Sequence, residues 1–137
     1  MLFVAVILII GAALLAWSTF GYHGVSDSET VEILQTEWAS HNHVAQLVRR
    51  SDHAALSGDT YFIFVADHLY SVPKLRKELY SLPPVFVADR SGIVLHWLSP
   101  HELSIQCQDC GITKGRMETQ KFSQEDVVIR YVGFPSE

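Results

Sequence analysis

The chain has 137 residues, 48% of them hydrophobic, and a formal net charge of -5 from 10 basic and 15 acidic side chains. A chain of this length has room for one small domain. Nucleic-acid binding depends on a concentrated basic surface, and basic residues cluster here only at Arg49-Arg50 and within 74–77, so the composition argues against a nucleic-acid partner.

The first 22 residues form an apolar segment, MLFVAVILIIGAALLAWSTFGY, without a charged side chain. About 20 largely apolar residues suffice for a helix to cross a bilayer, so residues 1–22 are predicted to be a transmembrane anchor. Trp17, Phe20 and Tyr22 are expected at the far membrane interface, where aromatic side chains are enriched. A cleaved signal peptide is the alternative, although it normally begins with basic residues that this segment lacks.

The orientation of the anchor is predicted from what precedes it. Neither flank carries a nearby Lys or Arg, so the positive-inside rule gives no direction. Only Met1 precedes the apolar segment, which favours an N-terminus in the cytoplasm and a C-terminal domain outside. The expected location is the inner (cytoplasmic) membrane of a bacterium, with a single span and a periplasmic or otherwise extracytoplasmic domain.

Residues 23–40 are predicted to form a polar tether followed by a short helix. Ser26 is followed three residues later by Glu29, which has the form of a helix-capping box. The apolar side chains that come next recur at helical spacing and are Val31, Leu34 and Trp38. We therefore expect a helix of two to three turns over residues 28–40.

Residues 41–137 are predicted to be a small antiparallel β domain. HVAQLVRR has the composition of a strand. TYFIFVAD has apolar side chains on both faces, so this strand is expected to be central in the sheet and covered on both sides. A short helix is expected to begin at Val72-Pro73 and to end before Pro83-Pro84.

The second half of the domain contains further strands at short intervals. PVFVA, IVLHWL and LSIQC are separated by the turn sequences DRSG and SPHE, which predicts three consecutive antiparallel strands. A weak strand is expected near METQKF, and DVVIRYVG is expected to close the sheet. The predicted fold class is α+β, mainly β: an N-terminal transmembrane helix, then a small antiparallel β-meander domain with one or two short helices.

A sequence unit within residues 93–107 supports the same fold class. Its pattern, hydrophobic-x-Trp-x-Ser-x-x-x-Leu-x-Ile, resembles a small uncharacterised bacterial family in which a membrane or lipid anchor carries a β-rich extracytoplasmic domain. The matching positions are Trp97, Leu103 and Ile105, and the resemblance implies that all three are core residues. It implies a fold and a location but no activity. The chain departs from that family in having no lipid-carrying cysteine near its N-terminus.

Cys107 and Cys110 are the clearest candidates for chemistry. In an oxidising compartment two cysteines three positions apart at a strand end favour a structural disulfide. Thiol-redox catalysis is less favoured because Asp109 opposes thiolate formation, and a zinc site would need two more ligands. His101 lies about 20 Å away along an extended strand and so is not expected to join such a site.

The histidines and the remaining motifs give no catalytic, cofactor or metal assignment. His41 and His43 are two residues apart and could share one strand face, but a solvated polar turn is the favoured interpretation. His96 is expected to be half-buried and hydrogen-bonded. No phosphate-binding loop, dinucleotide fingerprint or catalytic triad order is visible.

The sequence therefore predicts a membrane-anchored interaction or structural domain that binds a protein partner outside the cytoplasm. An envelope thiol-redox or metal-binding protein that uses Cys107 and Cys110 is the alternative. Enzymatic activity is left open, with no catalytic residue assigned and no cofactor expected.

Overall fold

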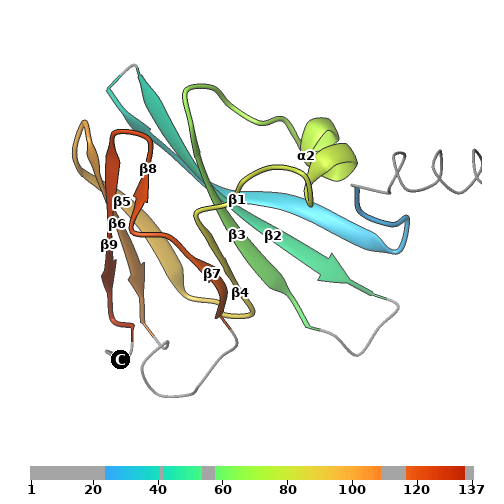
Figure 1. The fold of residues 1–137 in the computed structure, drawn as a ribbon. Coiled ribbons are helices and arrows are strands. Elements are labelled where there is room, and N and C mark those ends of the chain that lie inside the picture. Colours follow the sequence, from blue (N-terminus) through green and yellow to red (C-terminus); the bar gives the residue numbers. More distant parts are fainter. Residues whose placement is uncertain (1–23, 41, 54–57, 109–116, 135–137) are drawn as a thin grey trace, which may run out of the picture.

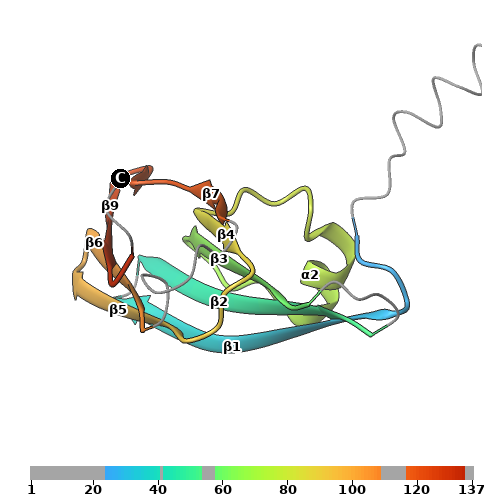
Figure 2. The ribbon, with the colours of Figure 1, turned by 90° about the horizontal axis from the view of Figure 1, so that it is seen from below.

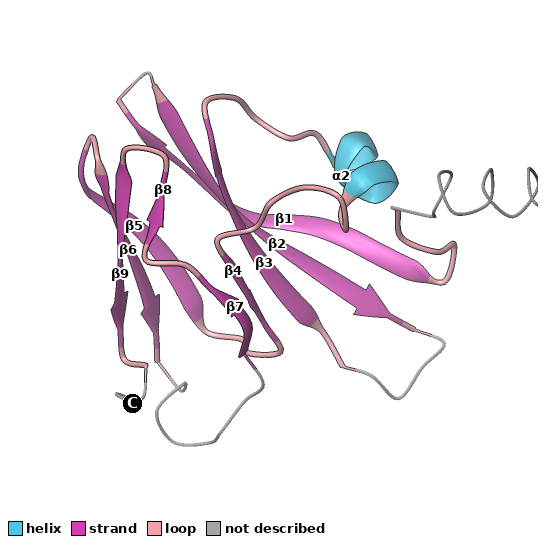
Figure 3. Cartoon of the chain, viewed as in Figure 1, coloured by secondary structure: helices cyan, strands magenta, loops and turns pink. Residues whose placement is uncertain are grey.

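The computed structural model describes residues 24–40, 42–53, 58–108 and 117–134, which form two β-sheets and a short helix (Figures 1 and 3). This confirms the prediction of a mainly β chain with antiparallel sheets and one short helix. No helix within these ranges is long and apolar enough to cross a membrane, and the predicted anchor, residues 1–22, lies outside them. The elements are β1 (Glu29–Ala39), β2 (His43–Asp52), β3 (Thr60–Ala66), α2 (Val72–Glu78), β4 (Phe86–Ala88), β5 (Ile93–Ser99), β6 (Glu102–Cys107), β7 (Met117–Gln120), β8 (Ser123–Gln124) and β9 (Val127–Val132).

The strands are divided between two sheets rather than joined in one meander. The first sheet has the order β1-β2-β3-β4-β7 and is antiparallel throughout, and the second has the order β5-β6-β9-β8. The predicted hairpin between PVFVA and IVLHWL is wrong, because β4 pairs with β3 and β7, while β5 pairs with β6 in the other sheet. The last long strand, β9, runs parallel to β6.

Two apolar cores explain why the chain divides its strands in this way. The first sheet is apolar on both faces and needs a cover on each. The second sheet covers one face and α2 covers the other, so the molecule has three layers (Figure 2). On β3, Ile63 faces the second sheet and Phe64 faces the helix, and both are fully buried, as predicted for a central strand. Leu103 and Ile105 of β6 are also fully buried in the core between the sheets.

The predicted helix over residues 28–40 is wrong, because this segment forms β1. Its composition, ETVEILQTEWA, is rich in β-branched and aromatic residues, which favour a strand once a neighbouring strand is available. Pairing with β2 supplies that neighbour along the whole length of β1. The helical spacing that suggested a helix includes Leu34, at a break in the strand register, and Trp38, and both side chains are exposed.

The predicted tether is also wrong from residue 24 onward. Val25 is buried among the side chains beneath α2, and its backbone N–H donates to the carbonyl of Arg76 at 2.8 Å. Gly24 lies so close to the helix that a Cβ would come within 2.6 Å of the same carbonyl oxygen. Only one of the two bonds of a capping box forms: the Ser26 N–H donates to the Glu29 carboxylate at 2.6 Å, but the Glu29 N–H donates to the Ser26 backbone carbonyl at 3.1 Å, which closes a turn before a strand.

The two sheets meet where β1 passes the edge strand β5. The Gln35 side chain donates to the Leu95 carbonyl at 2.9 Å and accepts from the Leu95 N–H at 2.9 Å, so one side-chain amide satisfies both backbone groups. The Trp97 indole N–H donates to the Glu37 carbonyl at 2.9 Å, and Trp97 is partly buried against the core. Side chains of one edge strand thus protect the other edge from external pairing.

Candidate functional site

A cluster of two histidines and one aspartate lies where three connections of the fold meet. His43 begins β2, His101 lies in the turn between β5 and β6, and Asp126 precedes β9. The turn is fixed to β9 because the N–H of Val128 donates to the His101 carbonyl at 2.9 Å. One potential ligand atom from each residue of this histidine–aspartate cluster lies within 4.8 Å of the other two.

Asp126 bridges the two imidazoles with its two carboxylate oxygens. His43 Nε2 is 2.9 Å from Asp126 Oδ1, and His101 Nδ1 is 2.9 Å from Asp126 Oδ2. Partial burial opposes ionisation of Asp126, but a hydrogen bond from its own backbone and the two neighbouring histidines outweigh that effect. The pKa of Asp126 therefore lies below its ordinary value, and the carboxylate is ionised at neutral pH.

Burial differs sharply within the cluster. His43 is 9% exposed, with its ring centroid 6.3 Å from that of Trp97 and 5.9 Å from that of His101. The side chains of His101 and Asp126 are each more than half exposed. Among the described residues no partner reaches His43 Nδ1, so ring packing rather than a second hydrogen bond orients this imidazole. The cluster thus has one fixed member at its base and two members open to solvent.

The donor set of the cluster is suited to a metal ion. Imidazole and carboxylate together are common ligands of zinc and of non-haem iron, and three protein ligands leave at least one coordination position for water or substrate. Without a metal ion, the same three residues form a polar network in which the Asp126 carboxylate lies between the two imidazoles.

The sequence singles out two members of this cluster, His43 and His101, but not together, and it gives no sign of the third. His43 was considered together with His41, which lies outside the described residues. His101 was considered only as a zinc ligand near Cys107, at the opposite end of β6, and Asp126 was not considered. Local spacing gives no signal for such a cluster, because its three residues come from separate connections and only the two-sheet topology brings them together.

The other residues singled out from the sequence lie in the core, on the exposed face of β5 or outside the described residues. Cys107 is 4% exposed in the core between the sheets, and Cys110 lies outside the described residues, so their disulfide stays a prediction. The predicted membrane-interface residues Trp17, Phe20 and Tyr22 also lie outside the described residues. His96 is exposed on β5 rather than half-buried, because β5 is an edge strand of its sheet.

No family model, curated protein or solved structure matches this chain. The resemblance at residues 93–107 therefore stays a prediction.

A buried ionic network joins the start of β1 to β2 and the end of the helix region. Arg50 donates to Glu29 at 2.7 Å and to Thr60 at 2.7 Å, and the Tyr80 hydroxyl donates to Glu29 at 3.1 Å. Burial opposes ionisation of Glu29, but hydrogen bonds from the Ser26 backbone, Arg50 and Tyr80 outweigh it, so the pKa of Glu29 lies below its ordinary value. The network ties the first residue of β1 to the domain.

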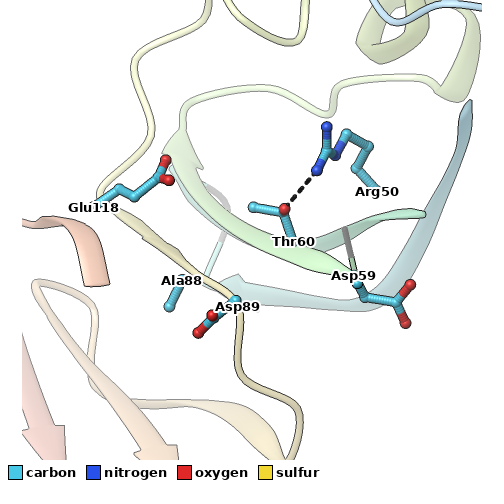
Figure 4. A pocket seen from close by; sticks show the side chains of 7 residues that line it. Arg50, Asp59, Thr60, Ala88, Asp89 and Glu118 are labelled. Atoms are coloured by element: carbon cyan, nitrogen blue, oxygen red, sulfur yellow. Dashed lines mark hydrogen bonds between the residues drawn. The ribbon is translucent and has the colours of Figure 1, made fainter. Parts of the chain in front are cut away.

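A polar cavity of about 260 Å³ lies beside this network, and Figure 4 shows the side chains around it. Arg50 and Thr60 are joined by their hydrogen bond, whereas the three carboxylates do not converge on one point. An excess of negative charge around one arginine is unsuited to an anion, and carboxylates that diverge are unsuited to a metal ion. We assign no ligand to this cavity. The lining residues are Arg50, Gly58, Asp59, Thr60, Ala88, Asp89 and Glu118.

Exposed aliphatic side chains gather on the outer face of the second sheet. The strand registers place Val94 of β5 and Val132 of β9 on either side of β6 in one row, and Val128 lies four residues before Val132 on the same face of β9. The ion pair between Arg130 and Glu102 lies on the same face. This aliphatic face, consisting of Val94, Leu98, Val128 and Val132, is mixed with charge rather than uniformly apolar.

Proposed function

We propose that this chain is a single-pass membrane protein whose β domain is held against the outer surface of the cytoplasmic membrane and binds another protein there. The observation that carries the proposal is the shortness of the connection between the predicted anchor and the domain. The apolar segment extends to Tyr22, and Val25 is already buried beneath α2. Two intervening residues span roughly 10 Å at most, so the start of the domain lies at the membrane interface.

The helix side of the domain suits this position. The first described residues, Gly24 and Val25, contact α2, so the described part of the chain begins beside this helix (Figure 1). Lys74, Arg76 and Lys77 give α2 a basic surface, which anionic lipid headgroups attract. Lys77 is exposed, while Arg76 donates to the Glu29 carbonyl and Lys74 pairs with Glu78.

The aliphatic face lies on the opposite side of the first sheet from α2, so it would be directed away from the bilayer (Figure 2). Exposed aliphatic side chains with an interspersed ion pair match the composition of a protein-binding surface, where apolar contacts are surrounded by polar ones. The same charges would disfavour insertion into lipid. A protein with a complementary mixed surface is therefore the partner that we propose.

Two experiments test the proposal. Alkaline carbonate extraction combined with the intact mass of the membrane-bound chain tests the anchor, and we expect an uncleaved protein in the membrane pellet. A photo-crosslinking amino acid at Val128 tests the binding surface, with the same probe at Thr36, an exposed position on β1, as the matched control. We expect an adduct from position 128 alone. A cleaved, extractable chain, or equal adducts at both positions, would contradict the proposal.

The cysteine pair fits this proposal as a structural element. Cys107 is 4% exposed within the core, an environment that supports a disulfide at a strand end rather than a reactive thiol. At the other side of that strand end a Cβ at Gly133 would come within about 2 Å of the Cys107 carbonyl oxygen, and Gly133 has a φ of +82°. Alkylation of the unfolded, unreduced chain should add no mass if Cys107 and Cys110 are paired.

A further inference from the structure

We propose that His43, His101 and Asp126 form a binding site for a single divalent transition-metal ion, with Zn²⁺ the ion that best matches the donor set. The proposal goes beyond the proposed membrane-surface function and does not depend on it. It assigns a metal ion to three residues that neither the sequence patterns nor the predicted cysteine chemistry brought together.

The geometry needs little adjustment to accept the ion. Zn²⁺ binds imidazole nitrogen and carboxylate oxygen at about 2.0–2.2 Å, which places neighbouring ligand atoms about 3.3 Å apart in a tetrahedral site. The two nitrogen–oxygen distances are now 2.9 Å, and all three ligand atoms lie within 4.8 Å of one another. The two short distances would have to open by a few tenths of an ångström, and the distance between the two imidazole nitrogens, which is at most 4.8 Å, would have to approach 3.3 Å.

The distribution of burial favours this adjustment. His43 is held by the core and by Trp97, so it provides a fixed ligand at the base of the site. His101 and Asp126 lie on exposed turns, where small side-chain rotations cost little packing. The open side is exposed to solvent, so a water molecule could complete the coordination shell.

The arrangement of the carboxylate between the two imidazoles is suited to a cation. Asp126 carries a negative charge at neutral pH, and each of its oxygens already faces a different imidazole nitrogen. A divalent ion in the same position interacts with the carboxylate and with both nitrogen lone pairs, and any proton on those nitrogens is released to solvent. His43 Nε2 then binds metal as the Nδ1–H tautomer, which packing alone must hold in place because no described residue accepts from Nδ1.

The full chain in detergent micelles, freed of metal by chelation, provides the test. Co²⁺ replaces Zn²⁺ in tetrahedral sites and reports its ligand geometry through visible absorption, so Co²⁺ titration followed by Zn²⁺ competition measures both binding and geometry. We expect saturation at one equivalent and loss of the Co²⁺ absorption when Zn²⁺ is added.

Variants separate this site from adventitious binding. His101→Ala and Asp126→Asn should each weaken binding more than about tenfold, since each removes one of three ligands from an exposed position that contributes little to folding. His68→Ala is the matched control, because His68 also pairs with an aspartate, Asp67, at 2.6 Å but has no second histidine in the described group. The control should bind like the unaltered chain.

The outcomes are distinct. Loss of binding in His101→Ala and Asp126→Asn, with full binding in His68→Ala, would support the site. Absence of saturable binding to the unaltered chain would overturn the proposal and leave the cluster as an ion-pair network. Equal binding by all variants would also overturn it, because the metal would then be held elsewhere. A failed anchor test leaves these results unaffected.

Discussion

Replacing Glu29 by Gln should destabilise the domain more than its position at a strand end suggests. The Glu29 side chain is 9% exposed and accepts hydrogen bonds from Arg50, from the Tyr80 hydroxyl and from the Ser26 N–H. The substitution keeps the size of the side chain but removes its charge. Arg50, whose side chain is 18% exposed, then lacks its buried counter-charge; it keeps the bond to Thr60, the contact with Tyr80 and at most a bond to the neutral amide oxygen of the new side chain.

The magnitude follows from the burial of the pair. Removing one partner of a buried ion pair typically costs about 3–5 kcal/mol of the free energy of unfolding. Arg50 is partly accessible to water and keeps a hydrogen bond to Thr60, so we expect a loss at or slightly below the bottom of this range, about 2–3 kcal/mol. A small domain has about 5–15 kcal/mol in total, and this loss should lower its melting temperature by on the order of 10 °C.

Urea unfolding of the full chain in detergent, followed by near-ultraviolet circular dichroism, measures this change. Glu32→Gln is the matched control, since Glu32 pairs with the next arginine, Arg49, on the same two strands, but its side chain is 57% exposed. An exposed pair contributes about 0–1 kcal/mol, so the control should unfold almost like the unaltered chain. Equal destabilisation by Glu29→Gln and Glu32→Gln would refute the argument from burial.

Three further predictions concern the same structure. Gly24→Ala should destabilise the domain by about 1–3 kcal/mol, because the added Cβ would come within 2.6 Å of a backbone oxygen of α2. A Cβ added at Gly58 has no atom within 4 Å, so Gly58→Ala should leave the thermal unfolding of the chain unchanged. Gln35→Ala should cost about 1–3 kcal/mol by leaving both backbone groups of Leu95 without partners, and hydrogen exchange of the Leu95 amide should accelerate. The pKa of Glu29 lies below its ordinary value, so the ionised side chain stabilises the fold fully above about pH 4.3, and this stabilisation is lost as pH falls through the folded pKa. The difference in the free energy of unfolding between the unaltered chain and Glu29→Gln should therefore become smaller in acid. A difference that does not change with pH would contradict this role of Glu29.

The strands with strong composition could be predicted from the sequence. TYFIFVAD is apolar on both faces, and β3 is indeed central, with Ile63 and Phe64 buried on opposite sides. Val72-Pro73 begins the helix as expected, with the Ser71 hydroxyl accepting from the Lys74 N–H. Local composition and turn chemistry suffice for such elements because they depend on neighbouring residues.

The errors came from interactions between distant segments. A spacing compatible with a helix was overridden in β1 because β2 provides a pairing partner along its whole length. The DRSG sequence has the composition of a hairpin turn, yet it carries the chain from one sheet to the other because both faces of the first sheet must be covered. The histidine–aspartate cluster depends on the same topology: His43 and Asp126 are 83 positions apart.

The most direct test of the proposed function is the side of the membrane on which the domain lies. A cysteine introduced at Ser123, which is exposed on β8, would be treated with a membrane-impermeant maleimide in intact spheroplasts and again after lysis, with the unaltered chain as the background control. The account predicts labelling of Ser123→Cys in intact spheroplasts and little labelling of the unaltered chain, in which Cys107 is buried. Labelling of Ser123→Cys only after lysis would place the domain in the cytoplasm and contradict the proposed function.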